Sequence, residues 1–191
     1  MNWKSKLTIS IRLAFLTLLA LPQAVQAETY RVSISSGGGQ ANADSHFPEL
    51  SQDGRFVAYS SEANNLVDGD NNGKKDVFVH DRMLGETKRV SIASDGAEAN
   101  GESGSRRLHI SGDGRYVIFD SLADNLVLND NNEAWDVVVH DIQTGDSRRV
   151  SVASNGMEAN GHSGQPYIST DGRFVTFESW ADNLVPGDSN G

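Results

Sequence analysis

The sequence contains no cysteine, and basic residues are few: 16 Lys and Arg stand against 26 Asp and Glu. Without cysteine the protein has no disulfide bond, no thiolate nucleophile and no thiolate metal site. The excess of carboxylates produces a surface that repels nucleic acid and favours solubility and cation binding. We therefore expect no nucleic-acid partner, and we expect stability to come from a packed core or from bound ions.

Long apolar runs are lacking after the start of the chain. A basic beginning precedes the apolar stretch 13–21, a proline ends it, and small residues lead up to Ala27. This pattern is typical of a secretory signal peptide over residues 1–27, with cleavage near Ala27. A membrane anchor is the alternative, but the apolar run is too short to cross about 30 Å of hydrocarbon.

Cleavage at this point would place the mature chain, residues 28–191, in the periplasm or outside the cell. It removes three basic residues and no acidic residue, so the formal net charge changes from −10 to −13. No later segment is long and apolar enough to cross a membrane, and we do not expect the exported chain to span one.

Catalytic and cofactor motifs are also lacking. There is no Gly-x-Ser-x-Gly elbow and no His-Glu-x-x-His or His-x-His spacing. Carboxylates are abundant, but most recur once per repeat, so no pair is singled out for glycoside chemistry. The glycines 37–39 do not join a strand to a helix and form no phosphate cradle. The sequence therefore contains no catalytic constellation, and we expect no enzyme activity from this stretch.

What the sequence does contain is one motif in three copies. The pattern Ser-x-Asp-Gly-Arg, followed by aromatic and β-branched residues, occupies residues 51–60, 111–120 and 169–178. Asp-Gly favours a tight turn, and the residues after it favour a β-strand. Three copies of such a unit indicate a repeat protein.

A second motif, Arg-Val-Ser, defines the period of the repeat. It begins at Arg31, Arg89 and Arg149, in steps of 58 and 60 residues. The two extra residues of the second copy fall within 93–107, a stretch rich in Gly, Ser and Asn, where we expect a loop. The repeat units are residues 31–88, 89–148 and 149–191.

Each full repeat has four strand signals and no helix signal. The expected strands are 47–50, 55–60, 76–80 and 86–92, then 106–110, 115–120, 136–141 and 146–152, then 166–169 and 173–178. Residues 29–35 resemble a lone fourth strand. Four antiparallel strands per repeat predict an all-β protein built from β-propeller blades, and a flat solenoid of hairpins is the alternative.

The motifs of the first repeat are also similar to those of a known family. Pro-x-x-Ser-x-Asp-Gly-Arg-x-Val-x-Tyr-Ser over 48–60, Asp-Val-Phe-Val-His-Asp over 76–81 and Arg-Val-Ser over 89–91 resemble the Trp-Asp-like propeller repeat of the TolB-like family. The resemblance covers nearly all of the mature chain. It implies a propeller fold but no single function, because that family includes transport accessories, sensor domains and the propellers of hydrolases.

The number of repeats bears on how the propeller would close. The sequence holds about two and a half blades and stops at Gly191, after the second strand of the third copy. Propellers typically have four or more blades, so we interpret the sequence as part of a longer propeller. If the chain does end at Gly191, self-association that closes a ring between chains is the alternative.

An acidic loop lies between the second and third strands of the first repeat. It has the Asp-x-Asp-x-Asn-Gly-x-x-Asp spacing of an EF-hand-type loop, in which oxygen ligands converge on calcium. The candidate ligands are the side chains of Asp68, Asp70, Asn72 and Asp76 and the backbone carbonyl of Lys74.

The alternative is that this loop is a turn without a metal, since Asp, Asn and Gly are common turn residues. Val79 stands where an EF-hand has its bidentate Glu, and the second copy has Leu128 and Glu133 in place of the first Asp and the Gly. Calcium is therefore a hypothesis for the first loop and a weaker one for the second.

A few residues break the repetition. Trp135 and Trp180 have no aromatic counterparts in the other copies, and Arg106 and Arg107 lie in the region of the two-residue insertion. Non-repeated residues commonly carry the specificity of a repeat protein, so these four are candidates for a binding surface. His80 and His140, in contrast, recur at one strand position, which favours a structural role.

These observations favour an exported β-propeller that serves as a binding or scaffolding module, with a protein as its expected partner. One alternative is the propeller portion of a larger secreted hydrolase or lyase. Another is a calcium-binding structural repeat of a cell-surface protein.

Overall fold

The structure is a computed structural model that describes residues 28–188. The predicted signal peptide, residues 1–27, lies outside the described residues. The chain divides into a segment that ends at Tyr30 and a unit that begins at Arg31, and the following description concerns the second unit. Within the described residues, regular structure consists of strands alone, and no helix could cross a membrane.

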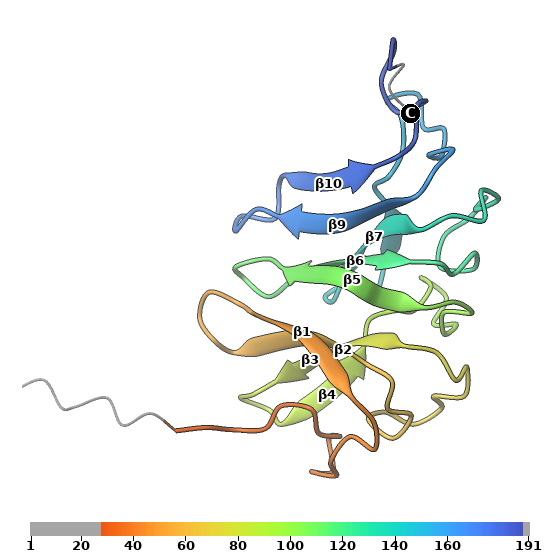
Figure 1. Ribbon diagram of the computed structural model, residues 1–191. Helices are drawn as coiled ribbons and strands as arrows, with labels where there is room; N and C mark the ends of the chain where they lie inside the picture. Colours follow the sequence, from red (N-terminus) through yellow and green to blue (C-terminus); the bar gives the residue numbers. More distant parts are fainter. Residues whose placement is uncertain (1–27, 189–191) are drawn as a thin grey trace, which may run out of the picture. The chain divides into compact units, whose positions relative to one another are not determined.

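Ten strands form two four-stranded antiparallel sheets and one two-stranded sheet (Figure 1). The first sheet consists of β1 (Ser45–Leu50), β2 (Phe56–Ser61), β3 (Asp76–Asp81) and β4 (Glu86–Arg89). The second consists of β5 (Ser103–Ile110), β6 (Tyr116–Ser121), β7 (Asp136–Asp141) and β8 (Ser147–Arg149). The third contains β9 (Ser163–Ile168) and β10 (Val175–Ser179).

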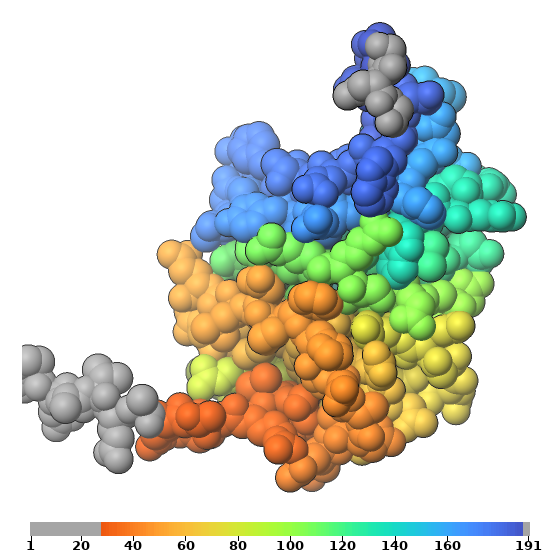
Figure 2. All heavy atoms as spheres, viewed as in Figure 1, coloured from red at the N-terminus to blue at the C-terminus, as the bar shows by residue number. Residues whose placement is uncertain are grey.

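Successive sheets pack face to face, so that the second repeat lies between the first and the third (Figure 2). One core cluster joins the first sheet, through Ala58 and Val79, to the second, through Leu108 and Phe119. Another joins Ile118 of the second sheet to Ile168 of the third. This is the packing of propeller blades and not of a flat solenoid, and it confirms the predicted all-β fold with four-stranded antiparallel blades.

The Ser-x-Asp-Gly-Arg motif makes the turn that was predicted from it. Ser51 Oγ donates a hydrogen bond to Asp53 Oδ1 over 2.6 Å and accepts one from the N–H of Phe56 over 2.9 Å. Gly54 follows with φ +73°, a conformation that costs glycine little. Arg55 then forms an ion pair with Asp81 at 2.6 Å, which ties the turn before β2 to the end of the neighbouring strand β3.

The same turns also link neighbouring sheets. The N–H of Gln52 donates to the carbonyl of Gly112, and the N–H of Gly112 donates to the carbonyl of Thr170, both over 2.9 Å. A Cβ atom on Gly112 would lie 2.3 Å from Thr170 Cγ2, so only glycine fits at this position of the second copy. The Asp-Gly turns thus form a chain of contacts from one repeat to the next.

The fourth strands are shorter than predicted. They end at Arg89 and Arg149 rather than at residues 92 and 152, because Ser91 and Ser151 turn their hydroxyls back to the third strand. Ile92 then pairs with Glu98 in an isolated bridge. Residues 29–35 are likewise not a strand: Ile34 makes the matching bridge to Gln40.

The expected loop over 93–107 is also partly wrong, because β5 begins at Ser103. Ser103 pairs with Ser121, and Leu108 pairs with Phe119. The chain therefore advances five residues along β5 while it advances only two along β6. In β1 the corresponding pairs are His46–Ser60 and Glu49–Ala58, so three residues of β1 span two residues of β2. The insertion of the second copy is therefore absorbed as a wider bulge within a strand.

Candidate functional site

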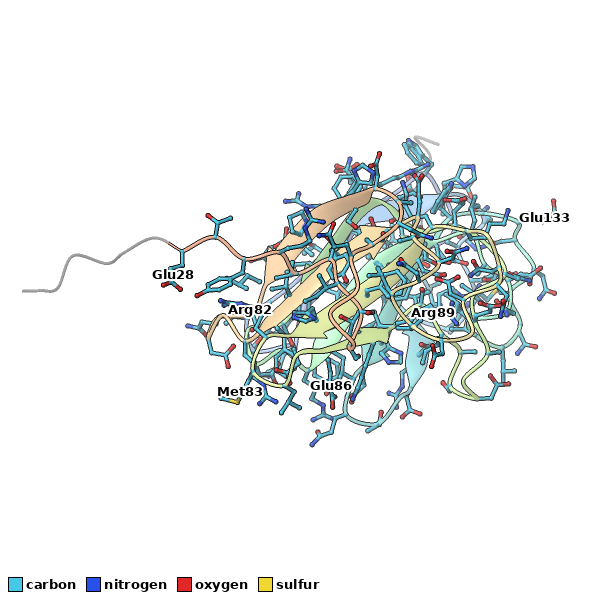
Figure 3. All side chains as sticks on the ribbon, turned by 90° about the horizontal axis from the view of Figure 1, so that it is seen from below. Glu28, Arg82, Met83, Glu86, Arg89 and Glu133 are labelled. Carbon is cyan, nitrogen blue, oxygen red and sulfur yellow. The ribbon has the colours of Figure 1, made fainter. Side chains whose placement is uncertain are left out.

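Two of the residues predicted to bind calcium, Asp70 and Asp76, contact an arginine. Arg89, labelled in Figure 3, places its Nη1 3.4 Å from both Asp70 Oδ1 and Asp76 Oδ2. It also lies 2.9 Å from Glu98 Oε2. Asp70 and Asp76 are buried, and burial raises the pKa of both carboxyl groups. A guanidinium therefore occupies the centre of the acidic group.

The other predicted ligands do not converge on that centre. Asn72 donates its amide N–H to Asp76 Oδ2 over 2.9 Å, and its carbonyl oxygen accepts the N–H of Lys74 over 2.7 Å. Asp68 and Lys74 are exposed. Over residues 28–188, no group of three or more acidic or histidine side chains is arranged to hold a metal ion. Calcium binding by this loop remains a prediction, and the arrangement accounts for its buried acids without a metal.

The second repeat has the same arrangement. Arg149 Nη1 lies 3.1 Å from Asp130, 3.0 Å from Asp136 and 2.9 Å from Glu158. Burial raises the pKa of Asp130 to about 6. Leu128 replaces the first acid of the loop, Asp68, yet the acids around Arg149 keep their arrangement. The feature that both repeats share is therefore an arginine among buried acids.

The two recurring histidines are part of the framework. His80 Nδ1 is 2.9 Å from Thr87 Oγ1, and His140 Nδ1 is 2.9 Å from Ser147 Oγ. The hydroxyl of Ser147 in turn donates to the carbonyl of Ile92, in the segment that joins the first sheet to the second. Burial lowers the pKa of both imidazoles, which favours their neutral forms.

The non-repeated residues, in contrast, come together. The guanidinium carbon of Arg106 lies 5.3 Å from the ring centroid of Trp135 and 5.2 Å from that of Trp180. Arg106 belongs to the wide bulge of β5, Trp135 precedes β7, and Trp180 follows β10. We call these three residues the Trp-Arg-Trp cluster. They lie where the second and third sheets meet.

Contacts around the cluster hold its rings in place. The backbone N–H of Trp135 donates to His162 Nδ1 over 3.0 Å. The ring of His162 meets that of Trp180 edge to face, with centroids 6.3 Å apart. Gly164 of β9 lies next to the side chain of Arg106.

The cluster has an exposed ring, and its guanidinium forms no ion pair within the described residues. Trp180 is 60% exposed, although an aromatic ring of this size is usually more buried. Within residues 28–188, the guanidinium of Arg106 makes no hydrogen bond or ion pair, whereas Arg55, Arg89 and Arg149 each bind carboxylates. In the first repeat, the positions of the two tryptophans hold Glu62 and Lys75, an ion pair 3.3 Å apart.

A buried acid lies behind the cluster. Asp120 on β6 is fully buried, and its Oδ1 accepts the backbone N–H of Arg106 over 3.3 Å. Its Oδ2 has no hydrogen-bond partner in the structure. Burial raises the pKa of Asp120 to about 6. The same register position holds Ser60 in the first repeat and Glu178 in the third.

A second non-repeated row crosses the first strands of the three sheets. His109 Nε2 on β5 is 3.7 Å from Glu49 Oε2 on β1, and its ring centroid is 4.1 Å from that of Tyr167 on β9. Burial lowers the pKa of His109. The row places a neutral imidazole between a carboxylate and a phenol, beside the Trp-Arg-Trp cluster on β5.

Sequence analysis identified the three members of the Trp-Arg-Trp cluster but did not predict that their side chains are in contact. Arg106, Trp135 and Trp180 were singled out because each breaks the repetition, and their contact depends on the packing of two sheets. Asp120 and the row through His109 were missed. The same signal, a register position that differs in every copy, would have found them.

No family model matches the chain, and no curated protein matches it. Among solved structures, it is similar to TolB from Acinetobacter baumannii, with 16% identity, a TM-score of 0.42 and coverage of 73% of this chain and 27% of that chain. It is also similar to the putative TolB from Agrobacterium tumefaciens, with 16% identity, a TM-score of 0.48 and coverage of 75% of this chain and 41% of that chain. A third similar structure is the β-propeller domain of the Trilobed protease from Pyrococcus furiosus, with 15% identity, a TM-score of 0.44 and coverage of 71% of this chain and 34% of that chain. The chain thus matches less than half the length of each of these proteins.

Proposed function

We propose that this chain is an exported β-propeller module that binds a protein partner through the Trp-Arg-Trp cluster. The observation that carries the proposal is the meeting of Arg106, Trp135 and Trp180, three non-repeated residues, on one accessible surface. Tryptophan and arginine are the residue types most enriched at the energetic centres of protein interfaces. Export follows from the predicted signal peptide.

The remaining conspicuous residues support this assignment by elimination. The repeated acids enclose Arg89 and Arg149, the repeated histidines bind hydroxyls, and the Asp-Gly turns link the sheets. Each of these groups is engaged within the framework. The guanidinium of Arg106 has no carboxylate partner within the described residues, and 60% of Trp180 is exposed, so both are available to a partner.

The experiment is partner capture with matched variants. The exported protein is purified with its bound proteins from the periplasm or medium of its own cells, as wild type and as Arg106→Ala, Trp180→Ala and Arg107→Ala. We expect a protein that is retained by wild type and by Arg107→Ala and lost from the other two. Arg107 is exposed and adjacent and has the same charge, but it contacts neither ring. A captured set that is the same for all four proteins would refute the proposal.

A further inference from the structure

The guanidinium of Arg106 is prepared for an anion. Rings of Trp135 and Trp180 approach it, so aromatic surface takes the place of water beside the cation. Its N–H donors have no acceptor among residues 28–188. A guanidinium presents these donors in a planar fork that matches the two oxygens of a carboxylate, and desolvation at the rings strengthens such a bond.

The charge of the whole chain limits what kind of anion can approach. The formal net charge is −10, and the carboxylate of Asp120 binds the backbone N–H of Arg106 within the bulge. A polyanion would meet repulsion from this surface at every position except the cluster. A single carboxylate on an otherwise neutral or basic chain would not. The exposed ring of Trp180, next to the guanidinium, offers apolar surface to the group that carries this carboxylate.

We infer that the Trp-Arg-Trp cluster is a receptor for one carboxylate of a partner peptide, bound by the fork of Arg106 with an adjoining apolar side chain over Trp180. This inference rests on the proposed function and names the chemistry of the partner. The carboxylate can be a chain terminus or an acidic side chain, and the experiment separates these two sources.

Tryptophan fluorescence reports on this site directly. The sequence has three tryptophans, Trp3, Trp135 and Trp180, so the full chain with Trp3→Phe emits from the cluster alone. The probes are N-acetyl-Gly-Gly-Leu with a free carboxylate, its C-terminal amide, N-acetyl-Gly-Glu-Leu amide and hexaglutamate. We expect the free acid to change the emission saturably, and we expect the simple amide to bind at least about tenfold more weakly. Comparable binding of the free acid and the glutamate peptide would assign both carboxylate sources, and preference for one would identify it.

Variants in the same background test the role of the arginine. Arg106→Gln is expected to weaken binding of the preferred peptide by about tenfold or more, and Arg107→Gln is expected to leave it unchanged. Melting curves confirm that both variants are folded. Equal binding of acid and amide, tighter binding of hexaglutamate, or no saturable change up to millimolar peptide would overturn the inference. If partner capture depends on Arg106 while any of these occurs, the inference fails and the proposed function stands.

Discussion

Arginine has two opposite roles in this protein, and the difference lies in what surrounds the side chain. Arg89 and Arg149 neutralise buried carboxylates within the sheets to which they belong. The guanidinium of Arg106 lies against two aromatic rings and forms no ion pair within the described residues. The first role recurs with the repeat, as expected of structure, and the second occurs once, as expected of function.

The buried carboxyl of Asp120 is expected to make stability depend on pH. Its pKa is raised by burial to about 6, so the folded state holds its proton more tightly than the unfolded state. The stabilisation from this proton is complete below about pH 4 and is lost as the pH rises through 6. Asp120→Asn should therefore be more stable than wild type at pH 7.5, by about 3 kcal/mol, and nearly equal to it at pH 3.5.

Urea unfolding of both proteins at the two pH values measures this difference. Ser60→Ala changes the matching position of the first repeat without a titrating group and serves as the control, with the same effect at both values. If the stability difference between Asp120→Asn and wild type is independent of pH, Asp120 does not titrate in this range.

The arginine cluster gives a prediction that also tests calcium. Arg89→Met leaves Asp70, Asp76 and Glu98 without their cation, and breaking a buried pair of this kind costs about 3 kcal/mol or more at neutral pH. Arg31→Met, at the matching position of the first copy, is the control because Arg31 is exposed and, within the described part of the chain, binds only the side chain of Gln40.

Thermal melting with and without millimolar calcium extends the same experiment. If the loop of Asp68, Asp70, Asn72, Lys74 and Asp76 binds calcium, the ion should raise the melting temperature, and more so in Arg89→Met, where the carboxylates are released. An identical melting temperature with and without calcium in both proteins would end the calcium hypothesis for this loop.

At the scale of the element, the wide bulge of β5 distinguishes the second sheet from the other two and carries Arg106. The strand carries two more residues than its counterparts, and residues 104–107, which include Arg106 and Arg107, are left out of its pairing with β6. Deletion of both should convert the bulge to the narrower form seen in β1 and β9. A surface loop or bulge tolerates such a change because the flanking pairs keep their register.

We expect this deletion to change the free energy of unfolding by no more than about 1 kcal/mol, while the fluorescence response to peptide is abolished. The strand content, measured by far-ultraviolet circular dichroism, should stay the same. A deletion that prevents folding would show that the extra residues belong to the framework of the second sheet.

Most of the strands could be predicted from the sequence because their signals are local. The Asp-Gly turns, the second and third strands and the absence of helices all follow from turn chemistry and β-branched residues within a few positions. The ends of the fourth strands could not be predicted. They depend on Ser91 and Ser151, whose hydroxyls bond across the sheet to residues 15 positions earlier.

At the scale of the whole molecule, the sheets are joined by contacts that repeat with the chain. Gly112 shows how strict these contacts are, because a methyl group there would overlap Thr170 of the next repeat. Gly112→Ala is expected to destabilise the protein by about 1–3 kcal/mol through overpacking. Gln52→Ala, at the same position of the first turn, should be nearly neutral, since a side chain is already accommodated there. Equal melting temperatures for the two variants would mean that the sheets pack differently.

The candidate site belongs to this scale as well, and for that reason it was only partly predictable. Repetition identified which residues differ between copies, but the contact of Arg106 with Trp180 joins different sheets. The acidic loop shows the converse limit. Its local spacing predicts a metal site, which remains a prediction, but gives no sign that Arg89 from a later strand lies beside Asp70 and Asp76.

The most direct test of the central claim is site-specific photocrosslinking in the exporting cell. A photoreactive amino acid replaces Trp180 in one protein and Leu122, its exposed counterpart in the second repeat, in another. The account predicts a covalent adduct with a specific protein from position 180 that is absent at position 122 and is lost when Arg106→Ala is added. Equal adducts from both positions, or none from position 180, would contradict it.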